Sequence, residues 1–185
     1  MAISWYPGHM RKANKELAKL VKASDLIVEL LDARTPNASR NPLLASVGKN
    51  LPRIIILNKS DLADPDTTAK WHSYFDAQIE SEDRAICFSN NMHAPISAGK
   101  IASTARKLLA KKTKPHDSVQ LIIVGIPNVG KSTFINTLSG RKIAKTGNEP
   151  AITKGQQRIK LDDNLYLVDT PGLLWPKLED QVAAY

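Results

Sequence analysis

Residues 125–132, Gly-Ile-Pro-Asn-Val-Gly-Lys-Ser, have the residue types and spacing of a phosphate-binding loop. The stretch lies between an apolar run at 119–124 and a segment that we expect to be helical from about Lys131. A glycine-rich turn between a buried strand and a helix directs backbone N–H groups and the positive end of the helix at a polyphosphate. In this pattern Lys131 reaches the β- and γ-phosphates and Ser132 ligates Mg²⁺. The stretch therefore predicts a nucleoside triphosphate site, which also includes Val129, Gly130 and Thr133.

Residues 58–61, Asn-Lys-Ser-Asp, end another apolar run and are typical of guanine recognition. The Asp61 carboxylate can accept hydrogen bonds from both the ring N1–H and the exocyclic amine of guanine. Adenine presents an acceptor there, so an adenine nucleotide would leave the carboxylate unpaired. We expect Asn58 to steady the loop and contact the base, Lys59 to cover the ring face with its stem, and Ser60 to lie in the same site. Together with the phosphate loop, this motif predicts GTP and GDP as ligands.

Two further loops follow apolar runs and complete the expected nucleotide site. After the run 84–88, a backbone N–H near Ser89 and Asn90 could donate to the guanine O6. The later Asp-Thr-Pro-Gly motif begins with Asp169, which could hold the Mg²⁺ shell through a water molecule. It ends with Gly172, whose N–H could meet the γ-phosphate.

The hydrophobic periodicity predicts an alternation of strands and helices that would place these motifs at strand ends. The expected strands are 26–31, 53–57, 84–88, 119–124, and a hairpin of 156–161 and 165–168. The expected helices are 9–23, 42–47, 64–78, 97–112, one from about 131 and one from about 177. In the helix from residue 64 we expect an aromatic core stripe of Trp71, Tyr74, Phe75 and Ile79. We therefore predict one α/β domain over residues 1–185, with the three-layer P-loop GTPase fold and a mostly parallel sheet.

The order of the motifs indicates a circular permutation of this fold. The base-reading motif at 58–61 precedes the phosphate loop at 125–132, the reverse of a Ras-like chain. Such a rearrangement is compatible with the site, because all its loops lie at one edge of one sheet and domain termini are often close together.

The composition indicates a globular protein with an excess of positive charge. The 185 residues are 42% hydrophobic and carry 26 Lys and Arg against 18 Asp and Glu, a formal net charge of +8. This charge suits a polyanionic partner beyond the nucleotide, although it also serves solubility. The single cysteine, Cys87, excludes an internal disulfide. With no apolar run near about 18 residues and no signal-peptide pattern, we expect a cytoplasmic protein without a membrane partner.

The segment 9–23 has the spacing of an amphipathic helix with a basic outer surface. Two interpretations stay open for it, contact with an RNA backbone and an ordinary solvated face. The basic residues are Arg11, Lys12, Lys15, Lys19 and Lys22.

Five motifs in this order resemble the ribosome biogenesis GTPase A (RbgA/YlqF) family of circularly permuted GTPases. They are residues 5–10 (Trp-Tyr-Pro-Gly-His-Met), 32–36 (Asp-Ala-Arg-Thr-Pro), 58–61, 125–132 and 169–176 (Asp-Thr-Pro-Gly-Leu-Leu-Trp-Pro). The match spans essentially the whole chain. It implies a monomeric bacterial factor that binds the precursor of the large (50S) ribosomal subunit and its rRNA late in maturation, with GTP hydrolysis coupled to release. It also implies a C-terminal helical domain that this sequence lacks.

The resemblance also implies roles for individual residues. Many GTPases place a water-orienting Gln after the Asp-x-x-Gly motif, but this chain has Leu173 and Leu174. In families similar to this one the histidine of the first motif is thought to orient the water, which here is His9; the alternative for His9 is a helix-start residue without chemistry. Thr153 would join Ser132 in holding Mg²⁺. Asn128 resembles the asparagine with which other GTPases hold potassium, and the alternative is that it only shapes the loop.

Two other functions remain open from the sequence. One is a GTP-gated RNA-binding scaffold whose hydrolysis is not required for release. The other is an unrelated P-loop ATPase or nucleotide kinase, against which the motif at 58–61 argues.

Overall fold

The computed structural model describes residues 7–77, 85–110, 117–140 and 158–170. The described residues form one six-stranded sheet with the strand order β3-β2-β1-β4-β6-β5. The strands are β1 (Leu26–Asp32), β2 (Arg53–Asn58), β3 (Ala85–Asn90), β4 (Val119–Val124), β5 (Arg158–Asp162) and β6 (Leu165–Asp169). All neighbours pair in parallel except β5 and β6, which form the antiparallel hairpin predicted from the sequence.

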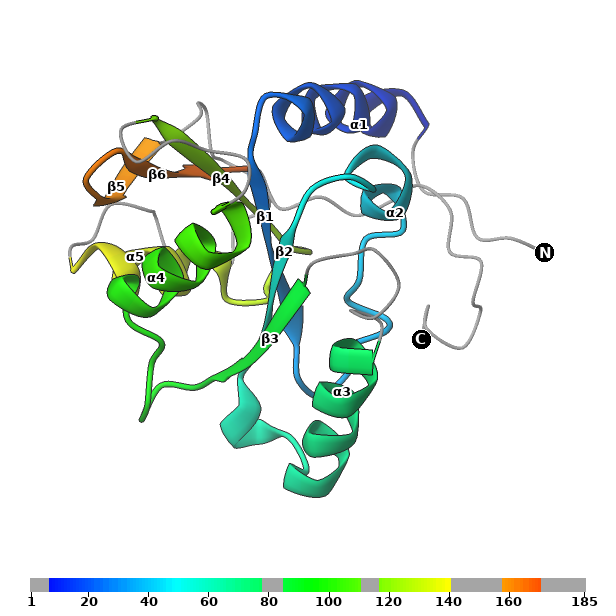
Figure 1. The fold of residues 1–185 in the computed structure, drawn as a ribbon. Helices are drawn as coiled ribbons and strands as arrows, with labels where there is room; N and C mark the ends of the chain where they lie inside the picture. The colour runs from blue at the N-terminus through cyan, green and yellow to red at the C-terminus, as the bar shows by residue number, and fades with distance from the viewer. Residues whose placement is uncertain (1–6, 78–84, 111–116, 141–157, 171–185) are drawn as a thin grey trace.

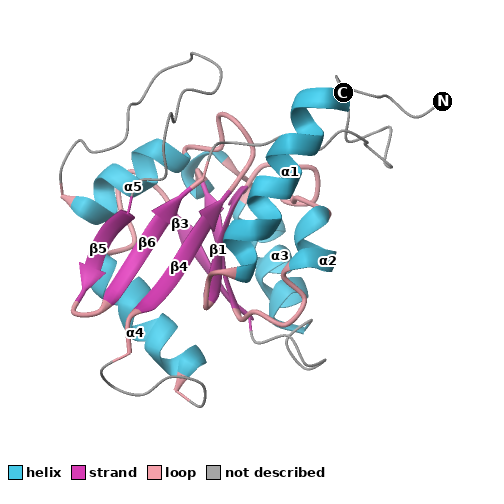
Figure 2. Cartoon of the chain, turned by 90° about the horizontal axis from the view of Figure 1, so that it is seen from above, coloured by secondary structure: helices cyan, strands magenta, loops and turns pink. Residues whose placement is uncertain are grey.

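Helices cover both faces of the sheet (Figures 1 and 2). On one face lie α4 (Ala98–Leu109) and α5 (Lys131–Ser139), and on the other lie α1 (Pro7–Lys22), α2 (Leu43–Val47) and α3 (Pro65–Ala77). Every residue of β1 and β2 is buried, as expected for strands covered on both sides. The structure is therefore the predicted three-layer α/β arrangement with a mostly parallel sheet.

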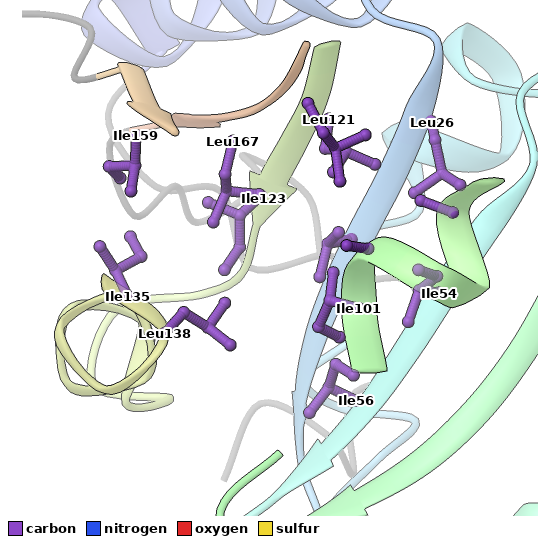
Figure 3. Packing of buried hydrophobic residues seen from close by; sticks show 14 of the residues in the cluster. Leu26, Ile54, Ile56, Ile101, Leu121, Ile123, Ile135, Leu138, Ile159 and Leu167 are labelled. Atoms are coloured by element: carbon purple, nitrogen blue, oxygen red, sulfur yellow. The ribbon is translucent and has the colours of Figure 1, made fainter. Parts of the chain in front are cut away.

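The largest apolar cluster fills the space between the sheet and the α4/α5 layer (Figure 3). Ile101 of α4 faces Ile54 and Ile56 of β2, while Ile135 and Leu138 of α5 lie under β4, β5 and β6. Burial of these side chains holds α5, and with it the loop before α5, against the strands that carry the other motifs.

The predicted boundaries hold within a few residues, with two differences of substance. Strand β3 continues to Asn90, two residues past the predicted end, so Ser89 and Asn90 are paired with β2. Tyr74 is 48% exposed and not part of the core stripe expected for α3. Thr68 and Phe75 face the sheet, whereas Tyr74 lies to the side of this face and packs edge-on against Trp71. Ile79, residues 111–112 and the helix expected from about 177 lie outside the described residues.

The strand order places a topological switch point between β1 and β4. The chain adds β2 and β3 on one side of β1 and then returns to place β4 on the other side. In open α/β sheets, ligands bind outside the carboxyl ends of the strands at such a point. Within the described segments, no helix has the length and apolar content needed to cross a bilayer.

Candidate nucleotide site

Polar residues end the strands on both sides of the switch point. The registers of the parallel strands pair Asp32 with Asn58, and Asn58 with Asn90. On the other side of β1, β4 leads into Gly125, and the neighbouring β6 ends in Asp169. The sheet thus brings the predicted base-reading and phosphate-binding motifs to one edge.

The phosphate loop runs from the end of β4 to the start of α5 at Lys131. Asn128 and Gly130 adopt positive φ angles of 62° and 95°. A Cβ on Gly130 would lie 2.5 Å from Asn58 Nδ2, so glycine is required there both by the backbone angle and by the close approach. Gly130 is also the N-cap of α5 and offers no capping side chain, which leaves first-turn N–H groups of the helix for an anion.

Asn58 ties the base-reading motif to the phosphate loop. Its Nδ2 donates to the backbone oxygen of Val129 at 2.8 Å, and its Oδ1 accepts from Asn90 Nδ2 at 2.7 Å. Both asparagines are buried, with 8% and 7% of their surface exposed. The sequence predicted that Asn58 would steady the loop and contact the base, and that a backbone N–H near Asn90 would donate to the guanine. In the structure the side-chain amides of both residues bond to the protein and to each other.

Lys59, the next residue, also connects the base-reading motif to the phosphate loop. The residue adopts a left-handed backbone conformation, and its Nζ donates to the backbone oxygen of Asn128 at 2.7 Å and to Asp32 Oδ2 at 3.0 Å. Its aliphatic stem therefore lies alongside the phosphate loop, where it could cover the face of a base.

Asp32 is a site residue that the candidate set from the sequence did not include. Besides Lys59, its carboxylate accepts from the Arg34 side chain at 2.9 and 2.7 Å. Burial alone would raise the pKa of Asp32, but hydrogen bonds from Arg34 and Lys59 outweigh burial and hold this pKa well below its ordinary value. A carboxylate directly after a buried strand, as at Asp169, was the signal that could have identified it.

Lys131 and Asp169 form an ion pair beneath the phosphate loop. Both are buried, with 8% and 1% exposed, and Nζ donates to Oδ1. The next residue along the chain, Thr170, anchors this strand end by donating from Oγ1 to the Ile123 backbone oxygen at 2.7 Å. The lysine predicted to bind phosphate is thus held by the carboxylate predicted to serve Mg²⁺.

The hydroxyl of Ser132 and the carboxylate of Asp169 are hard oxygen donors of the kind that suits Mg²⁺. Within the described segments, no group of three or more His, Cys, Asp or Glu side chains could hold a metal by itself. In nucleotide enzymes one or two protein oxygens usually hold Mg²⁺ together with substrate phosphates. The residues present fit the ion.

The remaining predicted residues lie around this centre. Ser60, in a short 3₁₀ helix (Ser60–Leu62), donates from Oγ to the Asn90 backbone oxygen at 3.1 Å, and the neighbouring Asp61 is exposed. Ser89 is exposed, with its Oγ 2.7 Å from His72 Nε2. Thr133 is exposed on α5.

Three predicted residues cannot be compared with the structure in full. His9 belongs to the first turn of α1, but its side chain lies outside the described part of the chain. Thr153 and Gly172 lie outside it entirely, as do Leu173 and Leu174. Their roles stay predictions.

Comparisons with known proteins agree with this architecture. Residues 120–184 match the model of a family described as 50S ribosome-binding GTPase. The ribosome biogenesis GTPase A of Priestia megaterium is 43% identical over 193 residues, covering 100% of this chain and 65% of the relative. The chain belongs to the ribosome biogenesis GTPase A family. The Thermotoga maritima member is 37% identical, over 95% of this chain and 61% of the relative.

Solved structures include a relative with the same architecture. GNP-bound YlqF from T. maritima matches this family member with a TM-score of 0.62 and 30% identity, over 94% of this chain and 63% of that chain. The fold is thus the circularly permuted P-loop GTPase fold of this family. This chain spans between 61% and 65% of the length of these three relatives.

Proposed function

We propose that this family member binds GTP and GDP, hydrolyses GTP, and acts as an assembly factor for the large (50S) ribosomal subunit, with hydrolysis coupled to release. The observation that carries the nucleotide part is the contact between the two motifs. Asn58 and Lys59 bond to backbone oxygens of the phosphate loop at 2.8 and 2.7 Å. The close contact between the predicted guanine-binding motif and the phosphate loop supports a guanine-nucleotide site and argues against the ATPase alternative.

Binding would divide between the two ends of the nucleotide. Exposed Asp61 would accept from the guanine N1–H and amine, while Lys131 would exchange Asp169 for the β- and γ-phosphates. The YlqF relative from T. maritima has been solved in GNP-bound and GDP-bound forms. We extend nucleotide binding from that protein to this chain on the strength of the shared fold and motifs.

Ser132, Thr153 and Asp169 would hold Mg²⁺, with Asp169 acting through a water molecule. The ion would neutralise charge on the phosphate oxygens. The chain's own part in hydrolysis is positioning: Lys131 and the first-turn N–H groups of α5 would hold the phosphates in line for attack.

His9 would orient the attacking water. The start of α1 lies toward the edge of the sheet at which the β4 and β6 arrows point (Figure 2), so this end of the helix is on the side of the site. For this role, the first turn of α1 would have to move toward the phosphate loop when nucleotide binds. No water-orienting Gln follows the Asp-Thr-Pro-Gly motif, which leaves this role to another residue.

Asn128 would hold potassium beside the β- and γ-phosphates. Its side chain is exposed at the tip of the loop, which supports this role. Its left-handed backbone and the bond from Lys59 to its carbonyl also support the simpler role of shaping the loop. Faster turnover in potassium than in sodium would favour the first role, and equal turnover the second.

The decisive experiment measures GTP hydrolysis by the full-length protein in potassium buffer, with and without large ribosomal subunits, beside the His9→Ala variant. We expect stimulation by the subunits that the variant loses, together with a preference for GTP over ATP in competition. Subunit binding without stimulation, and normal release of the His9→Ala variant, would instead support the GTP-gated scaffold. Preference for ATP would overturn the assignment of the base.

A further inference from the structure

Asn90 occupies a junction between four segments of the site. It ends β3 and is 7% exposed. Its Nδ2 donates to Asn58 Oδ1 at 2.7 Å, its Oδ1 accepts from the Ile96 N–H at 2.8 Å, and its backbone oxygen accepts from Ser60 Oγ at 3.1 Å. Through Asn58 it also reaches the Val129 carbonyl of the phosphate loop.

The backbone groups that bond to Asn58 and Asn90 determine how both side-chain amides are oriented. The Val129 carbonyl can only accept, so the Asn58 atom that faces it must be the nitrogen, and Asn58 must present its oxygen to Asn90. Asn90 must then present nitrogen to Asn58 and oxygen to its other partner. That partner is the Ile96 N–H, which can only donate. Every donor among these groups meets an acceptor, and no reversed arrangement does so.

We propose that Asn90 is a positioning residue for nucleotide binding: it fixes the orientation of the Asn58 amide and thereby the phosphate loop, without using its side chain on the nucleotide. The inference deepens the proposed function and rests on it. It is separate from the backbone N–H contact to guanine expected from the sequence, because it concerns the Asn90 side-chain amide, both ends of which are occupied within the protein.

Replacing Asn90 by Asp exchanges the amide nitrogen for a carboxylate oxygen and so removes the donor of the bond to Asn58 Oδ1. A carboxylate keeps an acceptor for the Ile96 N–H but offers no donor to Asn58. Two buried oxygens would then face each other. If the Asn58 amide turned over to donate to the carboxylate, its oxygen would meet the Val129 carbonyl. Either result weakens the bond from Asn58 to the Val129 carbonyl: the first displaces Asn58 by repulsion between the two oxygens, and the second replaces its donor with an acceptor.

Asn91 supplies a matched control one residue away. Its Oδ1 accepts from the backbone N–H groups of His93 and Ala94 at 2.9 and 2.6 Å. An aspartate accepts both bonds equally well. Asn91→Asp therefore makes the same chemical change and adds the same charge, but it removes none of these hydrogen bonds.

The test measures the Kd of GDP for the full-length protein by fluorescence titration. We expect Asn90→Asp to weaken GDP binding by about tenfold or more, and Asn91→Asp to change it by less than about twofold. Equal Kd values for the Asn90→Asp variant and the unmodified protein would overturn the inference. Absence of GDP binding by the folded, unmodified protein would overturn the proposed function first, and the inference with it.

A second comparison separates positioning through Asn58 from general loosening of the loops. In an Asn58→Ala background the partner of Asn90 is gone, so we expect Asn90→Asp to cost less than about twofold further. A full tenfold loss in that background would contradict action through Asn58. If thermal unfolding shows that the aspartate variant does not fold, Asn90→Ser replaces it in both backgrounds. Its short hydroxyl reaches neither partner and introduces no opposed charge, so we expect a smaller loss of the same kind.

Discussion

The Lys131–Asp169 ion pair is the contact that a nucleotide would replace in the proposed function. Because both groups are buried, removing one leaves the other charge without compensation. We expect Asp169→Asn to lower the free energy of unfolding without nucleotide by about 3 kcal/mol, measured by urea denaturation.

An exposed ion pair provides the control for this prediction. Arg106 and Asp162 lie 2.9 Å apart with about half of each side chain in solvent, at 41% and 48% exposed. Asp162→Asn should therefore cost less than about 1 kcal/mol. Similar losses for the two variants would show that burial of the Lys131 pair is not what determines its strength.

Asp32 predicts a pH dependence of stability. Its pKa is lowered in the folded protein, so near the unfolded value of about 3.9 the unfolded chain binds more protons than the folded one. This contribution is present above that pH and is lost as the pH falls through the range below it. We expect stability to fall less steeply between about pH 5 and pH 3 in Asp32→Asn than in the unmodified protein. Asp66→Asn, which removes an exposed carboxylate outside this network, is the control, and equal slopes for all three proteins would contradict the prediction.

The local motifs could be predicted from the sequence, but the contacts between them could not. The phosphate loop and the Asn-Lys-Ser-Asp motif are contiguous, and their residue types carry their chemistry. The bond from Asn90 to Asn58 and the bond from Lys59 to Asp32 join residues 32 and 27 positions apart. Those pairs depend on the register of β1, β2 and β3, which apolar patterning does not determine at the strand ends.

At the scale of elements, α5 is flanked by two glycines in the left-handed region, Gly130 before it and Gly140 after it, and the two glycines differ in surroundings. Gly130 has φ 95° and its added Cβ would meet Asn58, whereas Gly140 has φ 63° and nothing within 4 Å. We expect Gly140→Ala to cost about 1 kcal/mol of stability from backbone strain, and Gly130→Ala to cost more, because it also displaces the buried Asn58. Only Gly130→Ala should also weaken GDP binding, by about tenfold or more, because it displaces Asn58. Equal GDP affinities for the two variants would contradict the close approach.

Element prediction succeeded where burial on both faces gives long apolar runs. The central strands β1, β2 and β4 are such runs, and their predicted positions are confirmed within one residue. Strand β3 is at the sheet edge and its last two residues are polar, so its pairing to Asn90 was not visible in the sequence. The prediction that Tyr74 lies in the core was wrong for a related reason, since an aromatic residue on a helix can lie at the border of the core as well as inside it.

At the scale of the molecule, the permuted order leaves the site intact because parallel strands deliver their ends to one edge regardless of the order in which the chain visits them. Residues at the ends of β1, β2 and β3, together with Lys59 directly after β2 and the β4–α5 loop, contact one another there. The order of motifs still has a consequence, because the Asp-Thr-Pro-Gly motif begins at the end of β6, the last strand in chain order among the described residues. If Gly172 meets the γ-phosphate as we propose, a change there would act on the residues that follow this motif in the chain.

Charge is the other property of the whole molecule that bears on function. The formal net charge is +8, and exposed lysines lie on both sides of the sheet: Lys15 and Lys19 on α1, and Lys100 and Lys107 on α4. If general attraction to rRNA governs subunit binding, the double variants Lys15→Glu/Lys19→Glu and Lys100→Glu/Lys107→Glu should weaken it equally, because each changes the charge by the same amount. We expect a larger effect of the α1 pair, because α1 starts on the side of the site where His9 would act.

The measurement is the affinity for large ribosomal subunits as a function of salt. For the α1 pair we expect at least about a tenfold loss, and a slope of log K against log salt that is lower by about 2, one for each lost phosphate contact. For the α4 pair we expect a small change in affinity with the slope retained. Thermal unfolding of both variants checks that the fold is kept. A larger loss from the α4 pair would move the RNA-binding face to the opposite side of the sheet and leave α1 as an ordinary solvated helix.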